Sequence, residues 1–179
     1  DIQETQTDME TPHPTTAGRA RLAYAWIVLI AGWGATGAAF KLFWGTPALL
    51  PAVVRDVGLE LGLTYNLAIG IELAIVAVAL LKPRWGWVLE GLLLLVFDVV
   101  LTTQIAAGDA SCGCFGSKLS MPPWVMMAID SVLLLGLLAL RPWSALGRGV
   151  TPVLPLAAAG IVFVLPWLFD RQGQQGHAI

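Results

Sequence analysis

Long stretches without charge limit most strongly what this chain can fold into. The first runs from Leu22 to Phe40 without Asp, Glu, Lys or Arg. A membrane's hydrocarbon layer takes about 20 helical residues at ~1.5 Å each, so this stretch can cross it. The whole chain is 57% hydrophobic and 12% charged, whereas soluble domains carry about a quarter charged residues. We therefore expect an all-α integral membrane protein.

Four more apolar runs follow, so we expect five membrane-spanning helices, the first continuing to Trp44. The later spans are placed at about 60–81, 85–107, 122–140 and 150–169. Pro152, Pro155 and Pro166 predict a kinked last span. We found no internal repeat.

A shorter apolar stretch, residues 46–54, follows the first span and contains Pro47 and Pro51. It is too short to cross a membrane, so we expect an interfacial or re-entrant segment. The chain then divides into three parts. These are a polar tail at 1–20, a transmembrane domain at 21–142, and an extra transmembrane helix with a polar tail at 143–179.

Lys and Arg set the expected orientation, because cytoplasmic loops carry an excess of them. With five spans, one side holds Arg19, Arg21, Lys82, Arg84, Arg141 and Arg148. The other side holds Arg55, Lys118 and Arg171, with Lys41 near the end of its helix. We therefore expect a plasma (inner) membrane protein with a cytoplasmic N-terminus. The loop between the third and fourth spans then faces the periplasm or its equivalent.

That loop contains both cysteines of the chain, Cys112 and Cys114, separated only by Gly113. Two thiolates cannot complete a structural zinc site, and on an oxidising face a disulfide is the better interpretation. A bridge across one residue closes a small ring, which Gly113 permits. It would be strained, and strained exposed bridges tend to be oxidising and labile. Spacing alone leaves redox exchange, a passive bridge, idle thiols or a soft metal such as Cu(I) open.

The residues around the cysteines resemble a known family. The run Cys112-Gly113-Cys114-Phe115-Gly116 after a third span is similar to the MauE family of methylamine-utilisation membrane proteins, which are related to DoxX. The stretch 38–43 with Pro47 and Pro51, Glu72-Leu73 in the second span, and Asp130 in the fourth also match that pattern. The resemblance covers roughly residues 22–142.

The resemblance implies a four-helix membrane core that helps form disulfides in exported proteins, often beside a thioredoxin-like partner. It implies that Cys112 and Cys114 are the redox pair, supported by Gly113, Phe115 and Gly116. In methylamine utilisation the implied client is the disulfide-rich small subunit of methylamine dehydrogenase. The acidic tail and the fifth span lie outside the resemblance, so a fixed subunit of a larger membrane complex is the alternative function.

Reoxidation of the pair needs an electron acceptor. Membrane oxidases of the DsbB kind use a second cysteine pair and a quinone, and this chain has no second pair. The acceptor stays open between a membrane quinone beside the loop and a partner protein. Trp87, Phe115 and Trp124 could line a quinone site, although Trp at a membrane interface is ordinarily an anchor.

Charges inside the expected spans each need a partner, because hydrocarbon penalises them. From the outer ends Lys41 lies ~5 Å deep, Asp130 ~12 Å, Asp98 ~14 Å and Glu72 ~18 Å. We expect Lys41 to reach Asp130 or Asp98 more easily than Glu72, or to extend to the outer surface. Glu72 and Asp98 either relay protons or tie helices together. Glu90, nearer the inner interface, is expected to reach Lys82 or Arg84.

A transporter or metal-handling protein that uses Glu72, Asp98 and Lys41 is a third function class. The missing inverted repeat argues against it. The basic residues are scattered without a basic stripe, so we expect no nucleic-acid partner.

Overall fold

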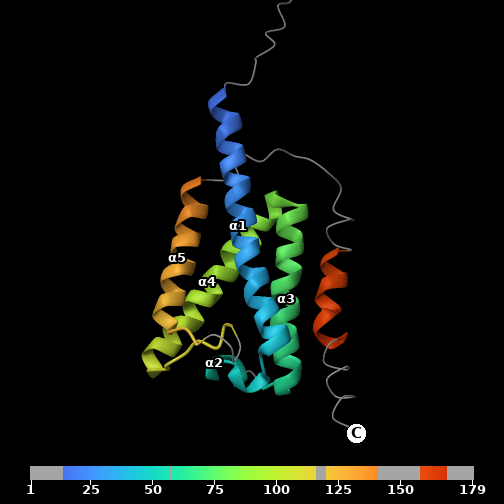
Figure 1. Cartoon of the computed structure of the whole chain (residues 1–179), viewed down its shortest axis with the longest axis vertical. Coiled ribbons are helices and arrows are strands. Elements are labelled where there is room, and N and C mark those ends of the chain that lie inside the picture. Colours follow the sequence, from blue (N-terminus) through green and yellow to red (C-terminus); the bar gives the residue numbers. More distant parts are fainter. Residues whose placement is uncertain (1–13, 57, 116–119, 141–157, 169–179) are drawn as a thin grey trace, which may run out of the picture.

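The chain forms an antiparallel bundle of long helices (Figure 1). The computed structural model describes residues 14–56, 58–115, 120–140 and 158–168, and within them no β-strand occurs. The bundle consists of α1 (Pro14–Trp44), α3 (Leu61–Leu81), α4 (Pro83–Ala107) and α5 (Pro123–Leu140). All four are long and apolar enough to cross a membrane. This confirms the all-α membrane fold.

The helices pack closely where small residues meet. α1 packs mainly on α3, and α4 lies between α3 and α5. A Cβ added to Gly86 of α4 would lie 2.8 Å from the Cβ of Ala79 on α3, so only glycine permits this approach. The indole of Trp26 lies over Gly136 of α5 and donates a hydrogen bond to the carbonyl of Leu133 at 3.0 Å. Small residues thus set the helix spacing, as in membrane bundles generally.

The first helix starts earlier than the sequence suggested. α1 begins at Pro14, inside the segment that we expected to be a polar tail, and its apolar part begins at Gly18. Proline suits the first turn of a helix because its missing N–H would be unpaired there in any case. Hydropathy marks where a helix enters lipid, so it does not detect a polar first turn.

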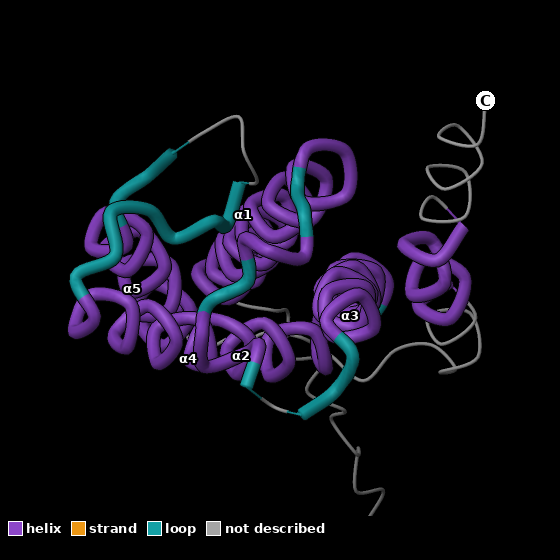
Figure 2. The backbone as a smooth tube through the Cα atoms, turned by 90° about the horizontal axis from the view of Figure 1, so that it is seen from below, coloured by secondary structure: helices purple, strands orange, loops and turns teal. Residues whose placement is uncertain are grey.

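The segment after α1 is short and helical, and it does not cross the membrane. It consists of a 3₁₀ turn, η1 (Pro47–Leu49), and one helical turn, α2 (Ala52–Arg55), neither with a buried residue. Both lie at the end of the bundle where the cysteine loop lies, which we call the cysteine end (Figure 2). Pro47 is the first residue of η1 and Pro51 is the N-cap of α2, so both prolines lie at helix starts, where proline is well tolerated.

An apolar helix, Ala158–Leu168, lies within the expected fifth span. It packs beside α3, where a Cβ on Gly70 would lie 2.8 Å from the carbonyl oxygen of Phe163 (Figure 1). The described part alone is too short to cross the hydrocarbon layer. Residues 150–157 and Phe169 lie outside the described residues, so the full span and its kink stay predictions.

Candidate functional site

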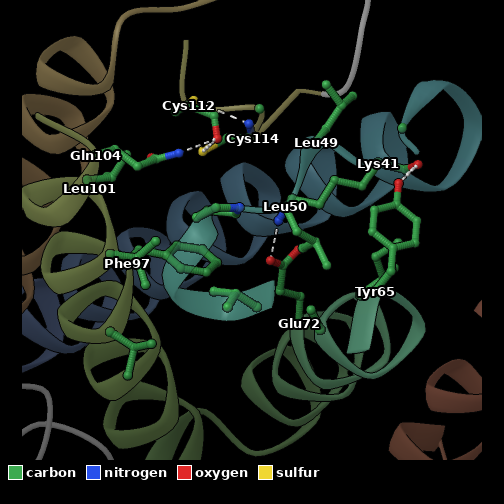
Figure 3. Close-up of a pocket in the computed structure, with 18 of the residues that line it drawn as sticks. Lys41, Leu49, Leu50, Tyr65, Glu72, Phe97, Leu101, Gln104, Cys112 and Cys114 are labelled. Atoms are coloured by element: carbon green, nitrogen blue, oxygen red, sulfur yellow. Dashed lines mark hydrogen bonds and ion pairs between the residues drawn. The ribbon is translucent and has the colours of Figure 1, made fainter. Parts of the chain in front are cut away.

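The cysteine loop joins α4 to α5 and is anchored to both. α4 ends at Gly108, in the left-handed conformation with φ 76°. The Cys112 backbone N–H donates to the carbonyl of Met121 at 3.0 Å, just before α5. Gln104 of α4 donates from its side-chain amide to the carbonyl of Cys112 at 3.2 Å. These bonds hold Cys112 at the cysteine end of the bundle; Figure 3 shows the bond from Gln104.

Gly113 brings the two cysteines and the η1 segment together. Its φ of 67° lies in the left-handed region, which side chains disfavour. A Cβ there would also lie 2.5 Å from the carbonyl oxygen of Leu49. The turn directs the Cys114 N–H toward the Cys112 sulfur at 3.3 Å, and the Cys114 sulfur lies 3.7 Å from the Cys112 carbonyl oxygen. The backbone therefore turns at Gly113, which brings the two cysteines into contact.

The two cysteines are both free thiols but differ in exposure and proton affinity. Cys112 is 2% exposed, whereas Cys114 is partly exposed. The pKa of Cys112 is lowered to about 7, chiefly because the Cys114 thiol donates a hydrogen bond to the Cys112 sulfur. Burial raises this pKa, whereas backbone N–H groups and the Lys41 ammonium lower it further. The same thiol–thiol contact and burial raise the pKa of Cys114. Deprotonation of the pair therefore occurs first at Cys112.

Phe115 anchors the loop from the other side of the cysteines. Its ring is 3% exposed and makes edge contacts with Trp33 at 5.5 Å and Phe40 at 5.4 Å between centroids. These aromatic contacts tie the loop to α1. Gly116 lies outside the described residues.

Lys41 forms an ion pair with Glu72. From the expected depths in the membrane, Glu72 was the less favourable partner. The expectation that Lys41 reaches Asp130 or Asp98 more easily was therefore wrong. Helical side chains lean toward the N-terminus of their own helix. Because α1 and α3 are antiparallel, the Lys41 side chain leans away from the cysteine end, into the bundle. The Glu72 side chain leans toward the cysteine end, so the two side chains approach each other. Cα depths alone overstate the distance between their charges.

Asp130 and Asp98 link helices. Asp130 is 1% exposed and accepts a hydrogen bond from the indole N–H of Trp33 on α1 at 3.0 Å. Asp98 accepts one from the hydroxyl of Ser131 on α5 at 3.3 Å. Both carboxyls thus tie α5 to a neighbouring helix.

Glu90 is buried in the bundle and does not make the contact that we expected. It is 2% exposed, and neither of its carboxyl oxygens has a hydrogen-bond partner among the described residues. The predicted contact with Lys82 or Arg84 was wrong. Glu90 is one turn after Gly86, whose close contact with Ala79 turns this face of α4 into the bundle.

A cavity of about 250 Å³ connects the cysteines to the Lys41–Glu72 pair (Figure 3). Besides those four residues its walls include Tyr65 of α3, Phe97 and Gln104 of α4, and Leu49 and Leu50 of the short segment. Trp87, Phe115 and Trp124, which we suggested as quinone contacts, are not among its lining residues. Sequence reasoning missed Gln104 and Tyr65. The only sequence signal for Gln104 was that a polar side-chain amide occurs about one turn before the end of the apolar run 85–107.

Comparisons with known proteins support the resemblance. Neither the curated proteins nor the solved structures give a match. The family described as methylamine utilisation protein MauE matches residues 18–144, which include α3, α4, α5, the cysteine loop and all of α1 except its first turn. That is well over half of the chain. This multi-pass membrane protein therefore belongs to the MauE family.

Proposed function

We propose that this protein exchanges disulfides with exported proteins through Cys112 and Cys114. Its membership of the MauE family supports a membrane accessory role in methylamine utilisation. The observation that carries the finer proposal is the cysteine pair itself. Two thiols of unequal exposure and unequal proton affinity contact each other at one end of a membrane bundle.

The cysteine end faces the periplasm or its equivalent in this proposal. The excess of Lys and Arg at the opposite ends of the helices supports that orientation. An oxidising compartment is also where disulfides form and persist. Exported proteins meet the protein on that side of the plasma membrane.

The client thiolate attacks the sulfur of Cys114 in the oxidised pair. Cys114 is partly exposed, whereas Cys112 is buried and poorly placed to meet an incoming protein. Cys112 is also the better leaving group, because its pKa is lowered to about 7 and low-pKa thiols leave faster. The backbone N–H of Cys114 stabilises the thiolate that leaves.

The exchange is balanced within the two proteins. Attack breaks the Cys112–Cys114 bond and forms a mixed disulfide between Cys114 and the client. The second client thiolate then attacks the client's own sulfur, which releases Cys114. The client gains one disulfide as two electrons pass to the pair, and the two client thiol protons end on Cys114 and on water. The small subunit of methylamine dehydrogenase is the client that the family suggests.

Trapping the mixed disulfide tests this direction of attack. In the variant Cys112→Ser, Cys114 is the only thiol of this chain, and it forms the same mixed disulfide by attacking the disulfide of an oxidised client. Cys112 can no longer resolve that adduct, so the client's second thiol is the only remaining route of release. We expect Cys112→Ser to capture exported proteins in reductant-sensitive adducts, and its matched control Cys114→Ser to capture far fewer. The measurement is non-reducing electrophoresis of alkylated membranes, with mass spectrometry of the adducts.

Two results contradict the proposal. Capture by Cys114→Ser in place of Cys112→Ser reverses the assigned roles. If neither variant captures a client and the double variant leaves exported disulfides intact, exchange is wrong. Loss of a larger membrane complex in that double variant then favours the fixed-subunit alternative.

A further inference from the structure

We propose that the cavity below the cysteine loop binds the ring of a lipid-soluble quinone, which reoxidises Cys112 and Cys114. This inference rests on the proposed function, because it supplies the electron acceptor for the same pair. The cavity places both sulfurs and the Lys41–Glu72 pair in one space, so a ring inside it lies next to the thiols (Figure 3).

The walls of the cavity suit a ligand that arrives through lipid. Most of its lining side chains are aliphatic or aromatic, including Ile69, Leu93 and Leu101. Ile71 of α3 and Val96 of α4 also line it, and they are 47% and 56% exposed on the flank of the bundle. That flank faces hydrocarbon in a membrane. The cavity therefore has a side entrance between α3 and α4 through which an isoprenoid tail can extend into the bilayer.

A few polar atoms in this apolar space fit a carbonyl oxygen of the quinone and a hydroxyl of the quinol. The ammonium of Lys41 has three N–H donors, so its pair with Glu72 leaves donor capacity for a carbonyl oxygen. At the other end, the Oε1 of Gln104 is buried and has no partner among the described residues. Buried polar atoms without a partner are uncommon and call for an explanation. A quinol hydroxyl would supply the missing donor to this oxygen.

The aromatic ring of Phe97 also lines the cavity. Its centroid lies 5.2 Å from the Lys41 ammonium, so the ring and the charge flank the same space. A flat ring can stack on Phe97 while one of its oxygens meets Lys41. An apolar cavity with a few convergent polar groups is the usual form of a small-molecule site.

The redox step balances with the quinone as two-electron acceptor. The Cys112 thiolate bonds to the Cys114 sulfur as Cys114 loses its proton, and two electrons pass to the quinone. The quinone takes up that proton and one from water at the rim, which gives the quinol. Lys41 stabilises the negative charge that develops on the nearer oxygen during the transfer.

The test uses the full chain in lipid nanodiscs, with a fully substituted, decyl-tailed benzoquinone as the probe. Full substitution prevents thiols from adding to the ring. We expect the reduced protein to consume about one quinone per cysteine pair, followed by quinone absorbance and by thiol titration. Val96→Trp, at the side entrance, should slow this step about tenfold or more. Val99→Trp is the matched control, since Val99 is 60% exposed on the same helix and does not line the cavity.

A second measurement separates this inference from the proposed function. The chemically oxidised wild-type protein and Val99→Trp are mixed with a reduced dithiol peptide, and both should exchange at the same rate. Exchange without quinone reduction would show that the quinone site is wrong, and so would equal slowing of quinone reduction by Val96→Trp and Val99→Trp. In either case the exchange proposal stands. If the oxidised protein does not exchange at all, the proposed function fails.

Discussion

Lys41 of α1 and Glu72 of α3 form an ion pair inside the bundle, directly below the cysteine loop (Figure 3). The Tyr65 hydroxyl donates to the carbonyl of Lys41 at 2.5 Å, which adds a second link between the same helices. The Lys41 ammonium also lies 5.2 Å from the ring centroid of Phe97 on α4. One lysine thus joins three helices at the floor of the site.

Removing either partner of this pair should destabilise the protein more than removing both. Glu72→Gln leaves a buried ammonium and Lys41→Met leaves a buried carboxyl, and breaking a buried pair costs about 3–5 kcal/mol. The double variant has neither charge, so its loss should be smaller than either single loss. Unfolding by SDS in mixed micelles measures the three free energies. Additive losses would show that the two groups do not interact.

The reactivity of Cys112 should follow a pKa near neutrality. Its pKa is lowered to about 7 from an ordinary 9.0, so the thiolate forms as the pH rises through about 7. Alkylation of the reduced protein by iodoacetamide should therefore reach half its plateau rate there. Mass spectrometric fragments assign the modified sulfur.

The control for this profile is Cys114→Ala. It removes the thiol hydrogen bond that lowers the pKa of Cys112 most, so the midpoint should move to higher pH. A midpoint near 9 in both proteins would mean that Cys114 does not stabilise the Cys112 thiolate.

Gly113 should tolerate a methyl group far less well than Gly108. Both have a positive φ, so alanine at either costs of order 1–3 kcal/mol of backbone strain. Only at Gly113 would the added Cβ also meet the Leu49 carbonyl, whereas nothing lies within 4 Å at Gly108. We expect Gly113→Ala to lower the rate of exchange with a reduced dithiol peptide, and Gly108→Ala to leave it near the wild-type rate. Equal rates for the two variants would disprove the close contact with Leu49.

The sequence was sufficient to predict the bundle. Each expected span in 60–140 begins or ends within two residues of α3, α4 or α5, because prolines, glycines and charges interrupt the apolar runs there. The loop that carries Cys112 and Cys114 also follows directly from those boundaries. Such features depend on short stretches of chain, which sequence patterns describe well.

Features that depend on how helices face one another could not be predicted in this way. The partner of Lys41 depends on the lean of side chains on antiparallel helices, and the burial of Glu90 on the rotation of α4 at Gly86. The cavity needs the η1 segment, the loop, α3 and α4 in their relative positions. No single stretch of sequence carries that information.

The redox state of the two thiols in intact cells tests the central claim most directly. Cells are treated with a reductant that cannot cross the membrane, washed, quenched in acid and alkylated with a maleimide polymer that adds mass to each free thiol. The account predicts an oxidised Cys112–Cys114 pair that the reductant opens, adding two polymers, and that closes again after washing. Two thiols that stay free throughout, or a bridge that the reductant never opens, would contradict it.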